Sequence, residues 1–183
     1  MSKPLLYVIV CGAGPASEVD KLVVLAQKRG WDVQIIATPA GLPFVDVKAL
    51  ETLTGNRVRS EYRKPGEPRS RPADGIIVAP ATYNTINKLA AGVSDTYALG
   101  VLSETIGLGL PVVVLPFVNS ALANREPFKR SVDQLRAEGV HVLLGPDAIE
   151  PHEPHTGGPL IEEFPWGMGL EQVLLVSDGS GAE

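Results

Sequence analysis

Short, continuous runs of apolar residues alternate with segments of helical periodicity along most of this chain. The apolar runs occupy residues 5–12, 31–39, 75–80, 110–117 and 140–146, and they are rich in Val and Ile. Such runs are typical of parallel strands that are covered on both faces. Three intervening segments end at Gly30, Gly55 and Gly139, as helices do, and Lys28 and Arg29 precede the first of these glycines. The alternation predicts an α/β fold: a Rossmann-like open parallel sheet with helices on both faces, in a single domain.

Charged residues are distributed unevenly along the chain. Its 183 residues, 44% of them hydrophobic, are enough for one domain with a sizeable core. Residues 145–183 contain eight acidic side chains and no Lys or Arg. We therefore predict a folded domain over residues 1–146 and an acidic, loop-rich C-terminal tail over residues 147–183. The Pro and Gly content of the tail favours extended loop and a frayed end over a packed helix.

Overall charge and composition argue against several classes of protein. A net charge of −5 disfavours a nucleic-acid-binding protein, and no apolar run is long enough to cross a membrane. The first residues read as a strand and lack the features of a signal peptide, so we expect a cytoplasmic protein. Cys11 is the only cysteine, which rules out an internal disulfide and a cysteine-based zinc site. We predict no metal.

Four loops follow the predicted strands at one edge of the sheet, where ligands of open α/β sheets bind. These loops cover residues 12–17, 38–44, 80–87 and 116–124. The first contains Gly12 and Gly14 but lacks the glycine triad of a dinucleotide fingerprint, and the chain has no Walker sequence. No acidic residue ends the second strand. These absences disfavour NAD and ATP, whereas a glycine-rich loop before a helix suits the phosphate of a mononucleotide.

The third loop contains more small polar side chains than helix capping requires. Thr82, Asn84, Thr85 and Asn87 follow the third strand within six residues, although one Ser, Thr or Asn is enough for a cap. An Asn amide offers two donors and an acceptor, which suit the edge of a flavin or pyrimidine ring. The excess favours a ligand. For Thr38 in the second loop, a phosphate contact and a capping role both remain open.

The same loops resemble the homo-oligomeric flavin-containing cysteine decarboxylases, which include phosphopantothenoylcysteine decarboxylase and the lantibiotic peptidyl-cysteine decarboxylases. The sequence APATYNTINKLAAGVSD resembles the PASANT motif of that family. CGAGPASEVDKL stands in place of the family's first glycine loop, TPAGLPF resembles the segment after the second strand, and LPFVNSALANREPF resembles the PxMNxxMW motif. The likeness extends from about Leu5 to Pro146.

The resemblance implies a Rossmann-like flavoprotein that binds FMN between the subunits of a homotrimer or a higher multiple. It also implies a small-molecule or peptide carboxylate as substrate. Asn119 would contact the substrate carboxylate, completed by Arg125 or by a basic residue of the Arg57–Arg71 segment. The residues expected to bind FMN are Gly12, Gly14, Ser17, Thr38, Phe44, Pro80, Ala81, Thr82, Asn84 and Thr85.

Departures from the family leave the reaction open. The family's catalytic histidine precedes the third strand, but residues 62–74 contain no histidine. Tyr83 stands where the PASANT motif has a small residue. We expect an FMN-dependent, decarboxylase-like enzyme that uses another base or runs another reaction. The alternatives are a non-catalytic flavin-binding regulatory or carrier subunit, a flavin prenyltransferase-like enzyme, and an α/β scaffold without a cofactor.

The basic segment before the third strand is either a solvated loop or a flap toward an anionic substrate.

Overall fold

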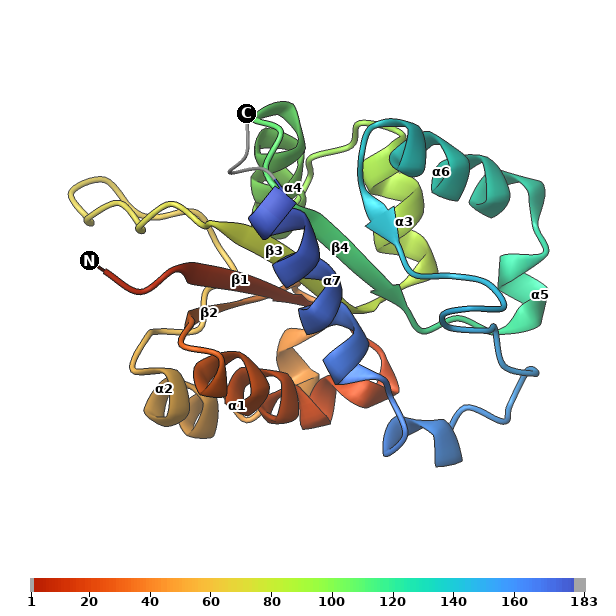
Figure 1. The fold of residues 1–183 in the computed structure, drawn as a ribbon, viewed down its shortest axis with the longest axis horizontal. Coiled ribbons are helices and arrows are strands. Elements are labelled where there is room, and N and C mark those ends of the chain that lie inside the picture. The colour runs from red at the N-terminus through yellow and green to blue at the C-terminus, as the bar shows by residue number, and fades with distance from the viewer. Residues whose placement is uncertain (1, 180–183) are drawn as a thin grey trace.

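The computed structural model describes residues 2–179 and contains a five-stranded parallel sheet with helices on both faces (Figure 1). The strand order is β2-β1-β3-β4-β5, so the chain reverses direction across the sheet after β2. The strands are β1 (Leu5–Val10), β2 (Asp32–Ala37), β3 (Gly75–Ala81), β4 (Val112–Pro116) and β5 (His141–Val142). This arrangement confirms the predicted α/β fold.

The helices connect successive strands, as parallel pairing requires. Between the first two strands lie the 3₁₀ helix η1 (Gly14–Glu18) and α1 (Asp20–Lys28); η2 (Leu42–Phe44) and α2 (Val47–Thr54) follow β2. The later helices are α3 (Tyr83–Ala90), α4 (Tyr97–Gly107), α5 (Ser120–Ala123), α6 (Glu126–Ala137), η3 (Pro159–Ile161) and α7 (Trp166–Gly179).

Two layers of core lie on the two faces of the sheet. Along β1, Leu5, Tyr7 and Ile9 pack on the face that α3, α4 and α6 cover, and the intervening residues pack on the face that α1, α2 and α7 cover. Every residue of β1 is buried, which explains why its sequence shows no polar alternation. The loops at the carboxyl ends of the strands are therefore held by a rigid, fully covered sheet.

The end of the chain corrects one expectation. Residues 166–179 form α7, which packs against β3, β4 and α1 rather than lying as an extended loop. Its close approach depends on Gly169, because a Cβ there would lie 2.7 Å from Cδ1 of Leu115. Trp166 and Leu170 of this helix are buried in the core. The predicted division of the chain at residue 146 stays a prediction.

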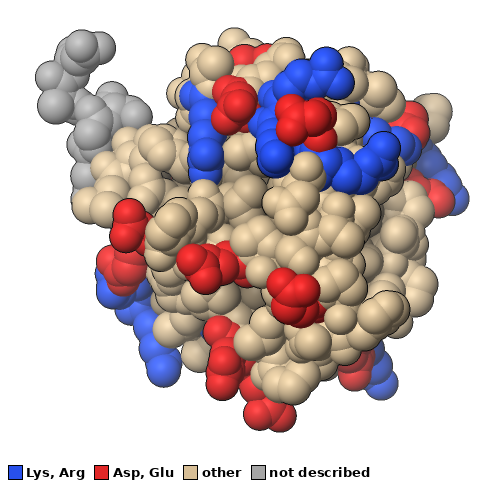
Figure 2. Space-filling view, turned by 90° about the vertical axis from the view of Figure 1, so that its right-hand side faces the viewer, with Lys and Arg blue, Asp and Glu red and all other residues tan. Residues whose placement is uncertain are grey.

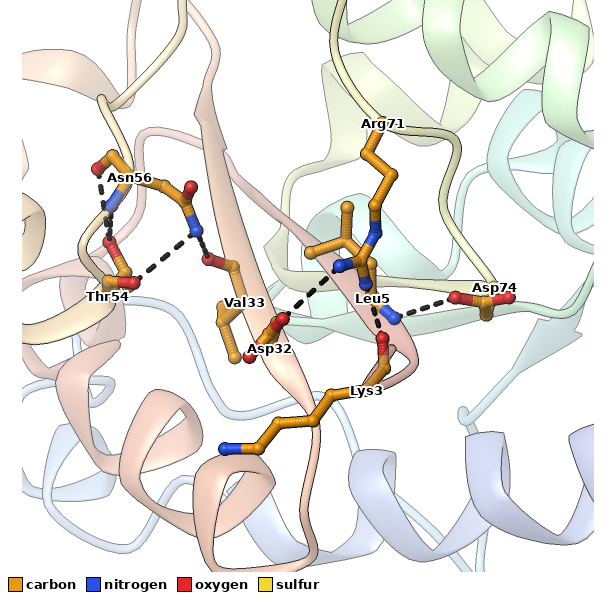
Figure 3. Close-up of polar contacts among 8 residues, drawn as sticks. All are labelled: Lys3, Leu5, Asp32, Val33, Thr54, Asn56, Arg71 and Asp74. Atoms are coloured by element: carbon orange, nitrogen blue, oxygen red, sulfur yellow. Dashed lines mark hydrogen bonds and ion pairs between the residues drawn. The ribbon is translucent and has the colours of Figure 1, made fainter. Parts of the chain in front are cut away.

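The segment that precedes β3 is tied down at both ends and has little regular structure between them (Figure 3). At its start, the Asn56 amide donates to the backbone oxygen of Val33 at 2.9 Å. At its end, Arg71 forms an ion pair with Asp32, and the Asp74 carboxylate accepts a hydrogen bond of 2.7 Å from the Leu5 N–H. The basic segment is thus fixed against the amino ends of β1 and β2.

Charged groups of both signs share the surface. Figure 2 shows the side of the molecule at the right of Figure 1, toward α5 and α6, with Lys and Arg gathered along its upper part and Asp and Glu scattered below. No helix within residues 2–179 combines the length and apolar character needed to cross a bilayer.

Candidate functional site

A cavity of about 560 Å³ opens at the carboxyl ends of the strands, as the loop positions predict. It is lined by the loops after β1, β2, β3 and β4, together with α3 and the start of α4. The lining residues are Gly12, Ala13, Thr38, Pro39, Ala40, Thr82, Tyr83, Asn84, Thr85, Lys88, Thr96, Leu99, Phe117, Val118 and Leu122. We call this space the strand-end cavity. All four predicted loops therefore contribute to one site.

Five of the residues predicted to bind FMN line the strand-end cavity, and six of the predicted site residues do not. The five are Gly12, Thr38, Thr82, Asn84 and Thr85. Those outside the lining are Gly14, Ser17, Phe44, Pro80, Ala81 and Asn119.

The residues outside the lining have other surroundings in this structure. A Cβ on Gly14 would lie 2.7 Å from Cδ1 of Ile161, so this glycine makes room for η3. The Ser17 hydroxyl donates to the Gly14 carbonyl at 3.2 Å, and Phe44 is exposed. Pro80 and Ala81 are buried at the end of β3. A cofactor contact for these residues stays a prediction.

Gly12 lets two loops approach each other at the mouth of the cavity. A Cβ at this position would lie 2.5 Å from the carbonyl oxygen of Ala40, which is closer than real Cβ atoms come to other heavy atoms. The loop after β1 can therefore lie against the loop after β2 only with glycine there. Gly12 and Ala13 both line the cavity, and the Ala13 N–H donates to the Cys11 carbonyl at 2.9 Å.

Asn84 is the polar side chain of the third loop that forms no hydrogen bond within residues 2–179. Thr82 caps α3, because its hydroxyl oxygen accepts a hydrogen bond of 3.3 Å from the Thr85 N–H. Asn87 accepts a hydrogen bond of 2.7 Å from the Ser131 hydroxyl and so ties α3 to α6. The Asn84 amide has no hydrogen-bond partner within residues 2–179, and its side chain is exposed at the cavity. It is therefore available to a ligand.

Thr38 closes a turn and does not cap the next helix, since the N-cap residue of η2 is Gly41. Its hydroxyl oxygen accepts a hydrogen bond of 3.0 Å from the Gly41 N–H and closes the turn after β2. A hydroxyl can accept and donate at the same time, so its proton stays available to the cavity that Thr38 lines. Turn closure and ligand contact are thus compatible at this position.

Cys11 lies beneath the third loop and takes no charge at neutral pH. Complete burial raises the pKa of its thiol, and interactions with Thr85 and Thr82 oppose this only in part. A buried thiol of raised pKa is a poor nucleophile. Cys11 therefore packs the floor of the site and does not supply a reactive thiolate.

Tyr83 forms a polar and aromatic cluster that the sequence did not reveal. Its ring stacks on Phe128 of α6 with centroids 5.4 Å apart, and its hydroxyl accepts a hydrogen bond of 3.0 Å from Arg125. Lys88, which also lines the cavity, forms an ion pair with Asp95. Arg125 therefore hydrogen-bonds to Tyr83, a residue that lines the cavity. The signal in the sequence was the large side chain of Tyr83 at a position where the motif has a small one.

Asn119 caps α5 in this structure. Its side-chain oxygen accepts a hydrogen bond of 3.0 Å from the Leu122 N–H. The chain before η3 lies alongside, because the Ser120 N–H donates to the His152 carbonyl at 2.7 Å. The His152 ring packs on Phe117 with centroids 4.8 Å apart, but it does not line the cavity. Within the described residues, no histidine lines the strand-end cavity, and no group of acidic, His and Cys side chains could hold a metal.

An open parallel α/β sheet with a cavity of backbone, hydroxyl and amide groups at its strand ends defines the class of cofactor-binding Rossmann-like proteins. Within that class, the chain belongs to the Flavoprotein family, whose model matches residues 1–162. This match confirms the predicted family.

Curated relatives agree with the family. The coenzyme A biosynthesis bifunctional protein CoaBC of Thermococcus kodakarensis is 27% identical over 145 residues, which make up 75% of this chain and 36% of that protein. The chain thus spans about a third of the length of such bifunctional relatives. The probable phosphopantothenoylcysteine decarboxylase of Streptococcus mutans is 28% identical over 141 residues, covering 73% of this chain and 75% of that protein.

A solved structure supports the fold. The FMN-dependent cysteine decarboxylase TvaF from thioviridamide biosynthesis superposes with a TM-score of 0.70 at 21% identity. The likeness covers 93% of this chain and 98% of that one. At this identity the similarity shows a shared fold.

Proposed function

We propose that the strand-end cavity binds FMN, and that the protein is an FMN-dependent enzyme of the decarboxylase type. The observation that carries this proposal is the unpartnered Asn84 amide in a cavity built by four strand-end loops of a Flavoprotein-family fold. The FMN named for the structural neighbour TvaF supports the same cofactor.

The residues present fit a flavin mononucleotide. A cavity of about 560 Å³ lies within the range of roughly 300–1,000 Å³ typical of small-molecule sites. Gly12 presents no side chain to the cavity, and Thr38 and Thr85 contribute hydroxyls; hydroxyl groups bind phosphate and ribityl oxygens. Asn84 would hydrogen-bond the polar edge of the ring, and Leu99 and Val118 offer apolar contacts to its faces.

The proposed reaction is the oxidative decarboxylation of a carboxylate that carries a neighbouring thiol. Bound FMN would supply the redox chemistry, as an acceptor of two electrons and two protons from the thiol-bearing end of the substrate; loss of the carboxylate as carbon dioxide would then leave an enethiol product. The protein binds and orients the carboxylate. Arg125, held on the Tyr83 hydroxyl, and the amide nitrogen of Asn119 are the donors we assign to this group.

A non-catalytic flavin-binding protein is the second candidate, and one observation favours it. No histidine within residues 2–179 lines the cavity, so the proton-transfer group of the related cysteine decarboxylases has no counterpart there. Such a protein would take up FMN with the same residues and would turn over none of the family's substrates.

Turnover separates these two candidates. FMN-loaded protein is mixed without oxygen with peptides that end in cysteine, and separately with phosphopantothenoylcysteine. Carbon dioxide release and loss of the yellow flavin colour are followed together. We expect phosphopantothenoylcysteine to fail, because the family histidine is missing. The enzymatic proposal expects the peptides to react, with another group serving as the base. Matching peptides that end in serine are the control. If no cysteine-ended substrate bleaches the flavin, the carrier role replaces the enzymatic one.

A further inference from the structure

A second cavity, of about 600 Å³, lies between α4 and the segment of residues 59–73. We call it the arginine cavity. It shares no lining residue with the strand-end cavity, although both use the first half of α4: Thr96 and Leu99 face one, and Tyr97 and Val101 line the other. The two spaces therefore lie on different sides of the same helix, and the proposed function leaves the second without a role.

Positive charge dominates the arginine cavity. Arg59, Arg63 and Arg69 line it, and Glu104 is its only acidic lining residue. No ion pair neutralises any of these three arginines within the described residues. Burial and the neighbouring Tyr97 raise the pKa of the Tyr7 hydroxyl, so this group adds no negative charge at neutral pH. The cavity therefore carries an excess of cationic donors.

The walls of the arginine cavity are aromatic and apolar. The rings of Tyr62 and Tyr97 meet edge to face, with centroids 5.2 Å apart. A Cβ on Gly100 would lie 2.2 Å from the Tyr62 hydroxyl oxygen, so glycine at this point of α4 admits the tyrosine. Leu110 and Val101 add apolar surface. These walls suit a ligand with an aromatic body rather than a simple inorganic anion.

Backbone hydrogen bonds to β2 hold Arg59 at the arginine cavity. The Arg59 N–H donates to the Ile35 carbonyl at 3.1 Å, and the Arg59 carbonyl accepts from the Ala37 N–H at 2.8 Å. The far end of the segment is held by Arg71 and Asp74 (Figure 3). Arg59 is half-buried, whereas Arg63 and Arg69 are exposed on the span between these anchors.

We propose that the arginine cavity is a second binding site, for a small organic anion that carries a phosphate or carboxylate on an aromatic body. Arg59 and Arg69 bind the anionic group, because guanidinium groups match the oxygens of both anions. Tyr62 and Tyr97 contact the aromatic part. Within one chain, the basic segment thus serves a site of its own and contributes no residue to the lining of the strand-end cavity.

Calorimetric titration of FMN-saturated protein with phenyl phosphate tests this proposal. We expect saturable binding by the wild type, at least tenfold weaker binding by Arg59→Met, and wild-type binding by Arg57→Met, an exposed arginine of the same segment outside the cavity. Phenol, which has the ring without the anion, should bind at least tenfold more weakly than phenyl phosphate. Benzoate then shows whether a carboxylate replaces the phosphate.

A second variant guards against a folding defect in the first. Gly100→Ala should displace Tyr62 and weaken binding of phenyl phosphate, while the flavin spectrum stays unchanged. The proposal is overturned if the wild type shows no saturable binding, if Arg59→Met binds as well as the wild type, or if phenyl phosphate releases FMN. The flavin content is measured separately, so a failure of this proposal differs visibly from a failure of FMN binding.

Discussion

At the scale of single residues, Asn84 differs from its polar neighbours because its amide has no hydrogen-bond partner within residues 2–179. Thr82 caps a helix, Thr85 contacts Thr82 and Cys11, and Asn87 joins two helices. The third loop does contain more polar side chains than one helix cap needs, but most of them form hydrogen bonds within the protein. Sequence spacing predicts where such groups gather, whereas the partner of each depends on packing that only the folded chain provides.

Asn84→Asp should weaken FMN binding about tenfold, because an amide donor becomes a charged acceptor beside an electron-rich ring edge. Fluorescence titration of the apoprotein with FMN measures the dissociation constant. Asn124→Asp, the same chemical change at an exposed position outside the cavity, is the matched control and should bind FMN normally. Equal FMN affinities for the wild type and Asn84→Asp would show that Asn84 does not contact the flavin.

Asn119→Ala should lower the free energy of unfolding by roughly 0.5–2 kcal/mol, because the Leu122 N–H loses its cap. Chemical denaturation measures the loss, and FMN should be retained. Asn119→Asp keeps a capping oxygen and should restore stability, yet it places a negative charge near the substrate carboxylate and should abolish turnover. An active Asn119→Asp enzyme would leave Asn119 as a cap alone.

At the scale of helices and strands, the sequence predicted the sheet well and the end of the chain poorly. The five apolar runs became the five strands, since buried parallel strands need continuous apolar sequence. Residues 166–179 contain three glycines and no strong polar stripe, so their pattern did not indicate a helix. Contact with the sheet, which Gly169 permits, stabilises α7 more than intrinsic propensity does.

Leu170→Ala should lower the free energy of unfolding by about 2–5 kcal/mol, because Leu170 is buried between α7 and the sheet. Leu175→Ala makes the same change in the same helix at a side chain that is 68% exposed, and it should alter stability by less than about 0.5 kcal/mol. Urea denaturation compares the two. Equal, small effects would mean that α7 does not pack as described.

At the scale of the whole molecule, the resemblance to the cysteine decarboxylases implies a homotrimer, and the structure limits where contacts could form. Ala98, Leu99 and Leu102 of α4 are buried in the core, so these apolar side chains are not available for a subunit contact. Leu108, just after this helix, is 68% exposed, and Val93, just before it, is 38% exposed. Apolar surface at these two positions is compatible with a subunit contact.

Light scattering coupled to size-exclusion chromatography should give three times the chain mass of 19.4 kDa at micromolar concentration. Val93→Glu introduces a charge at one of these apolar positions and should shift the mass toward a smaller species, whereas Leu175→Glu, on the exposed side of α7, should not. A monomeric wild type would reject the trimer.

FMN binding is the claim on which the rest depends, and the visible spectrum of the purified protein tests it most directly. The protein should be yellow, and heat or acid should release FMN that chromatography identifies, at close to one molecule per chain. Protein purified without the chromophore should recover the flavin spectrum when FMN is added. A colourless protein that takes up no added FMN would contradict the account.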